Sequence, residues 1–264
     1  MLALPEWLWM GFAGVFGAIV GSFLNVCIVR MPKDESVVTP RSHCPNCPHQ
    51  LQWWENIPIL SYVLLKGCCK GCKAKISMQY PFVEILTAAF SMLTWWWFDP
   101  LPYAIYFLLF IAPLIVITFI DLKHYIIPDI ISLPGIAIGF LVTLLFADEG
   151  LRIYLMIDRV LGVLVGGGGL YLIAWSYKKL KNQEGLGGGD VKLLAALGAF
   201  FGWKATIFIM MLSSVFGSVV GGLFLVLLKK DLKFAIPFGP FLAGAGICYL
   251  FIGRQLIEWY ITLF

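Results

Sequence analysis

Two aspartates lie at the ends of apolar segments, in positions that suggest acid–base chemistry. Asp121 closes the apolar run 111–120, and Asp190 closes the glycine-rich run 185–189 and precedes the apolar run 193–203. An ionisable side chain in a membrane span costs up to about 2.5–3.5 kcal/mol at the helix centre on insertion scales, so it marks a functional site by default. If the two carboxylates meet, they can share one proton and activate a water molecule.

Four cysteines form a second group with recognisable chemistry. Cys44 and Cys47 make one CxxC pair, Cys69 and Cys72 make another, and 21 residues separate the pairs. Each pair offers two thiolates from a tight turn, and four thiolates give the tetrahedral site that structural zinc favours. The spacing lies just outside the usual window. Two disulfides are the alternative, and they require an oxidising compartment.

Three neighbouring residues leave the ligand set open. Cys68 precedes Cys69 and could replace it, although the CxxC spacing favours Cys69. His43 and His49 flank the first pair and could also bind a metal, but four thiols are already available. The sequence therefore predicts Cys44, Cys47, Cys69 and Cys72 as zinc ligands.

The composition indicates an all-α polytopic membrane protein. Of the 264 residues, 60% are hydrophobic and 13% are charged, whereas about a quarter are charged in a soluble protein. A net charge of +4 gives no reason to expect a nucleic-acid partner. Glu6 alone is charged before the first apolar run, so we expect no secretory signal peptide. Spans of about 20 apolar residues suggest about eight transmembrane helices, near residues 8–29, 80–98, 102–120, 129–147, 159–176, 190–203, 205–228 and 235–253.

The basic residues predict the topology and the domain organisation. Of the 19 lysines and arginines, all but Arg152, Arg159, Lys204 and Arg254 fall on one side of these spans, which the positive-inside rule makes cytoplasmic. Asp121 and Asp190 then share the cytoplasmic face. We expect a first helix over residues 1–30, a cytoplasmic zinc-binding loop over 31–79 and a seven-helix membrane domain over 80–264. The loop has little core of its own, so a metal would supply folding energy.

Structural explanations compete with catalytic ones at the acidic residues. Asp190 could be the N-cap of its helix, and Asp121 could be a solvated residue paired loosely with Lys123. For Asp129, after Pro128, capping is the better explanation. Glu84 lies near the start of the second span, where its placement at a helix start competes with a substrate contact. His124 is a plausible base, but a single loop histidine is more often a bystander.

The chain as a whole resembles the type IV prepilin peptidases, also called prepilin leader peptidase/N-methyltransferases. Several motifs carry the resemblance in the right order. They are Gly21-Ser-Phe-Leu-Asn-Val26 with Arg30-Met-Pro32, the two cysteine pairs, Glu55-Asn-Ile-Pro-Ile-Leu-Ser-Tyr62, Tyr80-Pro-Phe-Val-Glu84, Asp121 with Pro128-Asp129, and Gly187-Gly-Gly-Asp190-Val-Lys192. The extra Cys68 is the one departure.

The resemblance implies that Asp121 and Asp190 are the catalytic pair of an intramembrane aspartic protease of the GxGD type. It implies cleavage of the basic leader of type IV prepilins and type II secretion pseudopilins after a glycine, in the bacterial inner membrane, with the active site facing the cytoplasm. It also implies methylation of the new amino terminus, usually phenylalanine, from S-adenosylmethionine. Supporting roles fall to Gly187, Gly189, Lys192, Asp129, Glu84, Asn25 and Arg30, and membrane lipid is an expected neighbour.

The methyltransferase activity has no motif of its own. The chain contains no Rossmann-type Gly-x-Gly-x-x-Gly after a strand, so we expect the cytoplasmic loop, with Gly21, Asn25 and Arg30 beside it, to serve this activity.

The alternative function is a GxGD protease without methylation that acts on another membrane substrate. A transporter is disfavoured, because its carboxylates should lie mid-span between broken helices.

Overall fold

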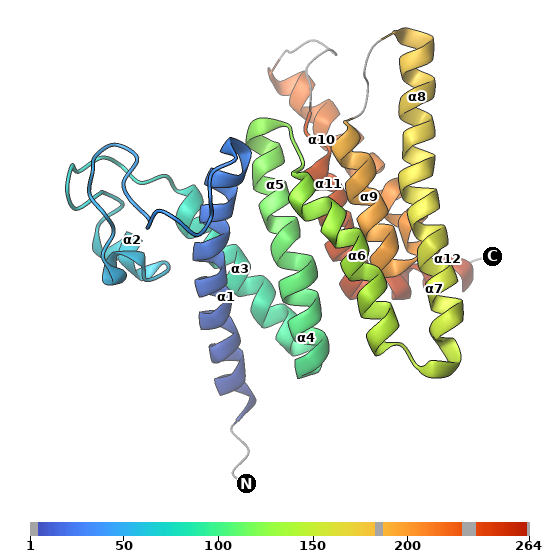
Figure 1. Cartoon of the computed structure of the whole chain (residues 1–264), viewed down its shortest axis with the longest axis horizontal. Coiled ribbons are helices and arrows are strands. Elements are labelled where there is room, and N and C mark those ends of the chain that lie inside the picture. Colours follow the sequence, from blue (N-terminus) through green and yellow to red (C-terminus); the bar gives the residue numbers. More distant parts are fainter. Residues whose placement is uncertain (1–4, 183–186, 229–235, 263–264) are drawn as a thin grey trace. The chain divides into compact units, whose positions relative to one another are not determined.

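The computed structural model describes residues 5–182, 187–228 and 236–262, and regular structure in these ranges is helical (Figure 1). In these described ranges, the only β-bridges are two isolated ones, His43–Gln50 and Cys68–Lys75. The chain divides into two compact units, Met1–Val116 and Ile117–Phe264. The expected all-α class is confirmed, while the division lies well after the loop boundary drawn from the sequence.

Five described helical segments are long and apolar enough to cross a membrane, which supports an integral membrane protein. These segments are Glu6–Lys33, Pro100–His124, Asp129–Phe146, Glu149–Lys181 and Trp203–Phe224. The other three expected spans also form helices, at Gln79–Trp97, Gly188–Phe201 and Gly239–Gly253. The first of these carries Glu84 and three tryptophans, which lower its hydropathy, and the other two are short.

In the first unit, a long helix packs against a second helix from after the loop. α1 (Glu6–Arg30) lies along α3 (Gln79–Trp97), and the buried Ser91 hydroxyl joins them by donating to the Ala13 carbonyl at 2.7 Å. Between them run the short helices η1 (Met31–Lys33), η2 (Trp53–Asn56) and α2 (Leu60–Leu64). α4 (Pro100–Tyr106) follows α3, with two prolines in its first turn, and continues through the π-helical turn η3 (Phe107–Ile111).

The next helix begins in the first unit and ends in the second. α5 (Ala112–His124) contains a run of buried apolar side chains that includes Ile115, Ile117 and Ile120. It ends where Tyr125 takes a left-handed conformation with φ 57°. The buried aliphatic run fixes the helix within the protein and places Asp121 in its last turn.

In the second unit, α9 (Gly188–Phe201) is the central helix. It packs against α6 (Asp129–Phe146), α7 (Glu149–Val163) and the π-helical turn η4 (Leu164–Gly169), which leads into α8 (Leu170–Lys181). Residues 193–200 of α9 are all buried. The remaining helices are α10 (Trp203–Leu228), α11 (Gly239–Cys248), the π-helical turn η5 (Tyr249–Gly253) and α12 (Arg254–Thr262). Burial on every side explains why α9 is apolar almost all round.

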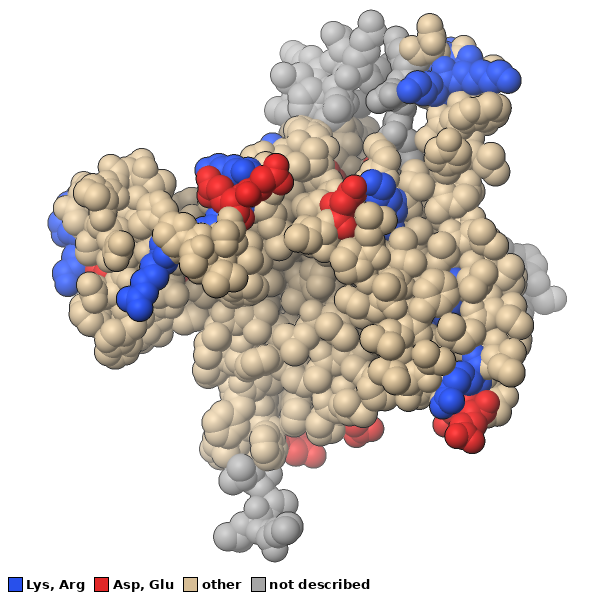
Figure 2. Space-filling view, in the orientation of Figure 1, with Lys and Arg blue, Asp and Glu red and all other residues tan. Residues whose placement is uncertain are grey.

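Charged side chains are sparse along the helices of the second unit and gather near the helix ends (Figure 2). This distribution is what a bundle surrounded by hydrocarbon requires, because charges are expensive at membrane depth. Lys229, Lys230 and Lys233, which contributed to the topology argument, lie outside the described residues, as do Gly185 and Leu186 of the glycine-rich run.

Candidate active site and metal centre

Asp121 is a buried carboxylate with a specific backbone partner. Its side chain is 5% exposed, and its Oδ2 accepts a hydrogen bond of 2.9 Å from the backbone N–H of Gly239, at the start of α11. The two residues are 118 positions apart in the chain. A solvated, loosely paired Asp121 is therefore not what the structure contains. The hydrogen bond fixes the orientation of the carboxylate against a neighbouring helix end.

Asp190 lies in the first turn of α9 and is half-buried. The N-cap residue of this helix is Gly187, so Asp190 is three residues inside the helix and does not cap it in the usual way. Gly187 lies close to its carboxyl group, since a Cβ atom added at Gly187 would lie 3.2 Å from Asp190 Oδ2.

One apolar residue and two glycines bring the aspartate-bearing helix ends together. Ile127, from the link between α5 and α6, touches both Gly189 and Gly239. A Cβ atom added at Gly189 would lie 2.8 Å from the Ile127 Cβ, and one at Gly239 would lie 2.7 Å from Asp121 Oδ2. These contacts place the end of α5 and the starts of α9 and α11 in one cluster of the second unit. That the two carboxylates converge there stays a prediction.

Asp129 and Lys192 form an ion pair beside the carboxylates. Lys192 Nζ donates to both carboxylate oxygens of Asp129 at 2.7 Å, and this contact links the first turns of α6 and α9. The N-cap of α6 is Pro128, so Asp129 is the first residue of the helix and does not cap it. The Asp129 side chain is exposed and that of Lys192 is partly exposed, which points to an alignment role for this pair. His124 is exposed at the end of α5.

Gly239 is the residue of this site that the sequence analysis missed. It lies in the segment Pro237-Phe238-Gly239-Pro240, where two prolines and a glycine precede an apolar run. Proline at the start of a helix is a recognised signal, and Pro240 does lie in the first turn of α11. The pattern predicts the helix start, but it contains nothing that specifies Asp121 as the partner.

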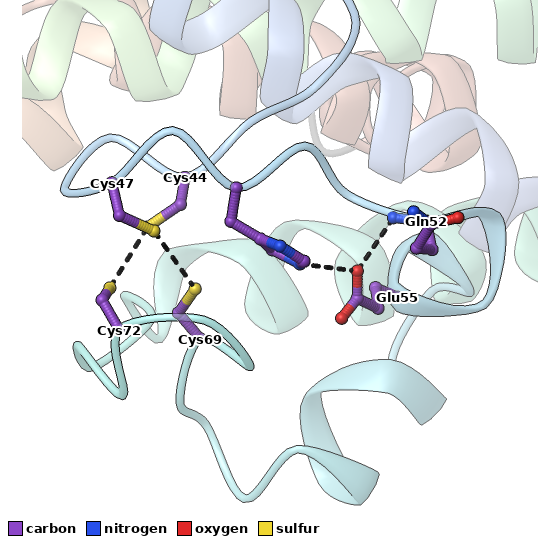
Figure 3. A network of polar contacts seen from close by, with 7 residues as sticks. Cys44, Cys47, Gln52, Glu55, Cys69 and Cys72 are labelled. Carbon is purple, nitrogen blue, oxygen red and sulfur yellow. Dashed lines mark hydrogen bonds and ion pairs between the residues drawn. The ribbon is translucent and has the colours of Figure 1, made fainter.

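The four cysteines of the CxxC pairs gather in the first unit, with their sulfur atoms all within 4.8 Å of one another. Figure 3 shows Cys44 and Cys47 on one turn facing Cys69 and Cys72 on the other. Each turn is closed by backbone hydrogen bonds, Cys44 N–H to the His49 carbonyl at 3.0 Å and Cys69 N–H to the Ala74 carbonyl at 2.8 Å. The β-bridges His43–Gln50 and Cys68–Lys75 brace the same turns.

The spacing of the sulfur atoms fits one tetrahedral metal ion. Metal–sulfur bonds of about 2.3 Å in a tetrahedron imply sulfur–sulfur edges of about 3.8 Å. The Cys44–Cys72 and Cys47–Cys69 sulfur pairs lie at 3.8 and 4.0 Å. None of the seven cysteines is in a disulfide, so the disulfide alternative finds no support here.

The competing ligands lie outside this cluster. Cys68 is half-buried and does not belong to the group of converging sulfurs. His49 Nε2 lies 2.9 Å from Glu55 Oε2, and His43 Nδ1 lies 3.2 Å from the Arg41 carbonyl. The hydrogen bond from the Gln52 N–H lowers the pKa of Glu55 below its ordinary value. The contact with His49 lowers this pKa further, by a smaller amount. His49 is therefore bonded to Glu55 and not directed at the sulfur cluster. Figure 3 shows Glu55 beside Gln52, apart from the four cysteines.

Near the end of α1, Arg30 binds the cysteine loop and Asn25 binds the start of α3. Arg30 is buried and donates to the carbonyls of Ser36 at 2.9 Å and Pro40 at 2.8 Å. Asn25 is also buried, and its amide N–H donates to the Tyr80 carbonyl at 3.0 Å. Its Oδ1 atom has no hydrogen-bond partner among the described residues. Arg30 thus holds the loop, whereas Asn25 keeps an acceptor available in a buried position.

Glu84 holds a strained turn of the same loop. It is buried in α3, and its Oε2 accepts a hydrogen bond of 2.7 Å from the N–H of Ile59. Ile59 has φ 62°, which a β-branched residue adopts only under constraint. Helix-start placement does not explain this glutamate, because its carboxylate accepts a hydrogen bond from a residue 25 positions away. Strained residues often occur at functional sites. The hydrogen bond to Glu84 stabilises the strained conformation of Ile59.

The fold and the two sites define a class of protein, a helical membrane protein with two aspartates at helix ends and a four-thiol site in its amino-terminal unit. Comparison with known families identifies it further. Residues 15–98 match the model of the bacterial peptidase A24 N-terminal domain, and residues 108–222 match the type IV leader peptidase family. The chain belongs to the type IV leader peptidase family.

Relatives cover the chain almost completely. A prepilin leader peptidase/N-methyltransferase of Aeromonas hydrophila is 38% identical over 98% of this chain and 96% of its own length. Proteins with the same name from Pseudomonas putida, 36% identical over 97% and 94%, and Pseudomonas aeruginosa, 35% identical over 94% and 91%, are also similar. No solved structure matched the chain.

Proposed function

We propose that this protein is a bifunctional enzyme of the bacterial inner membrane, which cleaves the leader peptide of type IV prepilins and methylates the new amino terminus. Near full-length similarity to proteins named prepilin leader peptidase/N-methyltransferase supports both activities. Cleavage after a glycine on the cytoplasmic side, and action on type II secretion pseudopilins and among membrane lipids, follow from the resemblance noted in the sequence. The observation that supports the peptidase proposal is the cluster of helix ends around Ile127, in which the buried Asp121 binds Gly239 and Gly189 is the chain neighbour of Asp190.

The peptidase chemistry needs two carboxylates in different protonation states. One, ionised, takes a proton from water, and the other, protonated, donates a hydrogen bond to the scissile carbonyl. Two carboxylates that share one catalytic site should titrate as a coupled pair. The Gly239 N–H orients Asp121. This contact comes from the backbone, so it holds the Asp121 carboxylate without a basic side chain.

Zinc is proposed as a structural ion at Cys44, Cys47, Cys69 and Cys72. The sulfur spacing fits it, and four-thiolate sites of this kind supply folding energy to small loops. The loop has short helices and braced turns with few buried apolar side chains, since Cys44 and Cys69 are the only hydrophobic residues buried between residues 31 and 79. Zinc would therefore hold the two turns together and take no part in cleavage.

S-adenosylmethionine is proposed as the methyl donor, bound by the first unit. The partnerless Oδ1 of Asn25 suits a ligand with amino-group donors, since a buried acceptor without a partner costs about 1–3 kcal/mol. When bound, S-adenosylmethionine supplies an electrophilic methyl group to the freed amine. Asn25 would bind it, and Arg30 and Glu84 would hold the surrounding loop through their contacts with Ser36, Pro40 and Ile59.

One incubation tests both activities together. Purified protein in lipid is mixed with a synthetic prepilin and isotopically labelled S-adenosylmethionine, and the products are read by mass spectrometry. We expect the prepilin to lose its leader at one glycine and then to gain one labelled methyl group. An intact prepilin would reject the peptidase, whereas a cleaved but unlabelled product would limit the enzyme to proteolysis.

A further inference from the structure

The second unit has an apolar groove on its outer surface. Its volume is about 610 Å³, and it is lined by Leu170 and Ile173 of α8, by residues between 210 and 218 of α10, and by residues between 236 and 241 that lead into α11. Three lining side chains are more than half exposed, namely Ile173, Met211 and Val215. The groove therefore faces the surroundings of the protein.

Two glycines of α10 shape one wall of the groove. A Cβ atom added at Gly217 would lie 3.5 Å from the rings of Phe238 and Phe241, and one at Gly221 would lie 2.7 Å from Ile236. The segment entering α11 thus lies directly against the α10 backbone. Because this segment is packed so close to α10, the space between α10 and α8 stays open.

One lining residue of the groove is the chain neighbour of the glycine that binds the proposed catalytic carboxylate. Phe238 lines it and is the N-cap of α11, and the next residue, Gly239, donates its N–H to Asp121. A single peptide unit therefore separates the apolar wall from the donor that orients Asp121. An occupant that presses on Phe238 lies beside the catalytic pair.

The lining of α10 suits a helix as the occupant. Residues 210–218 rise about 12 Å along the helix axis, which is a little over two turns. Ser214 and Ser218 are small and lie on this face at a spacing of four, and small residues let another helix approach closely in lipid. The Ser214 hydroxyl is already bonded to the Met210 carbonyl at 2.7 Å, so it adds no unsatisfied polar group. Met210 and Met211 add adaptable side chains.

We propose that this groove binds the apolar helix of the prepilin, the segment that follows the bond to be cut. Binding there would position that bond at Asp121 and Asp190. The inference rests on the proposed peptidase function. A prepilin provides an occupant of the right kind, because its apolar segment directly follows the cleavage site. The link from Phe238 through Gly239 to Asp121 favours substrate over the acyl chain of a bulk lipid, which has no reason to end beside a carboxylate.

Filling the groove tests the proposal through activity. In Ser218→Phe a bulky ring enters the groove, and in the control Val219→Phe the same ring is added at an exposed position of α10 that does not line it. We expect Ser218→Phe to lower kcat/KM for a full prepilin by roughly tenfold or more, a free-energy change within reach of one lost helix contact, while Val219→Phe stays near the wild type. Equal activity of both variants on the full prepilin would overturn the proposal.

A photo-crosslinking pair gives a second readout that does not depend on turnover. A benzophenone amino acid is placed at Ile173, which lines the groove, or at Leu172, which is 61% exposed on the same helix and does not line it. With an uncleavable prepilin, we expect crosslinks to the apolar segment from position 173 and few from position 172. Equal yields, or crosslinks to lipid alone at both positions, would contradict the proposal.

The two tests separate failure of the groove from failure of the enzyme. If the wild type leaves the prepilin uncut, the proposed function itself is rejected. If the wild type cuts the prepilin and Ser218→Phe cuts it equally well, the peptidase stands and the groove is not its substrate site. A short peptide that spans the cleavage site without the apolar helix should be cut equally by the wild type and by both variants, because it makes no groove contacts.

Discussion

The cysteine site of the first unit comes from one loop, Cys44 to Cys72, whereas the aspartate site of the second unit depends on residues as far apart as Asp121 and Gly239. In the loop, each pair of ligands is positioned by its own tight turn, with backbone bonds that close over a few residues. In the second unit, three helix ends must first be packed before the carboxylates meet. The first site is specified locally, and the second is specified by tertiary structure.

This difference predicts that the two sites fail in different ways. Damage to the loop should remove a metal and unfold one local region, with the helices of the second unit left in place. Damage to the aspartate cluster should change catalysis while metal content stays the same. The variants below separate these outcomes, and the largest expected effect comes first.

Replacing either catalytic carboxylate should have the greatest effect on cleavage. We expect Asp121→Asn and Asp190→Asn each to lower leader cleavage by about 10²–10⁴-fold, the usual range for a lost acid or base. Zinc content and methylation of a precleaved pilin should be unchanged, because the loop is untouched. Mass spectrometry of the products and metal analysis measure these quantities, and normal cleavage by either variant would refute the pair.

Removing one cysteine turn should produce the reverse pattern. In Cys44→Ser with Cys47→Ser, we expect zinc to fall from about one ion per chain to none, since two of the four thiolates are lost. Methyl transfer should fall with the loop structure, and leader cleavage should continue. Elemental analysis of the purified proteins measures zinc. A wild-type protein without zinc, or a double variant that keeps it, would contradict the metal site.

Gly239→Ala tests the tertiary dependence of the aspartate site. The added Cβ would lie 2.7 Å from Asp121 Oδ2, so the carboxylate must move from its present position. A displacement near 1 Å can cost on the order of 10²-fold in rate, and we expect cleavage to fall by roughly ten- to hundredfold. Gly244→Ala in the same helix is the control, because nothing lies within 4 Å of its added Cβ. Equal cleavage by the two variants would show that Gly239 has no positioning role.

The smallest effect is expected at the exposed ion pair. Lys192→Met removes the contact with Asp129. The side chain of Lys192 is 38% exposed and that of Asp129 is 57% exposed. Exposed pairs of this kind contribute about 0.2–1 kcal/mol, so cleavage should change by a few-fold at most. Thermal unfolding should shift slightly, and less at high salt, where exposed charges are screened. A loss as large as that of Asp190→Asn would assign Lys192 a direct part in the chemistry.

The sequence was most informative where the signal is local or periodic. Long apolar segments predicted several helices within a few residues, as with 129–147 for Asp129–Phe146, whereas the helical segment expected over 159–176 already begins at Glu149. The CxxC spacing predicted which cysteines gather, because a tight turn fixes the distance between its two thiols. The five candidate spans found by length and hydropathy are fewer than the eight expected, because burial lets α9 be short and α3 carry polar groups.

Contacts between distant residues could not be predicted in the same way. Glu84 was interpreted as a helix-start residue or a substrate contact, yet it accepts the N–H of the strained Ile59. The role of Gly239 cannot be predicted from the sequence, since nothing in Pro-Phe-Gly-Pro specifies Asp121 as its partner. Such pairings depend on how helices pack, and a single sequence carries the packing only implicitly.

The central claim is that Asp121 and Asp190 form one catalytic centre, and the geometry of a bound substrate tests it most directly. A cryo-EM map of the enzyme with an uncleavable prepilin would locate the scissile carbonyl and both carboxylates. We predict that each carboxylate has an oxygen within hydrogen-bond reach, about 2.6–3.2 Å, of the carbonyl or of one shared water. A bound prepilin whose scissile bond lies against only one of the two aspartates, with the other in a separate environment, would contradict the account.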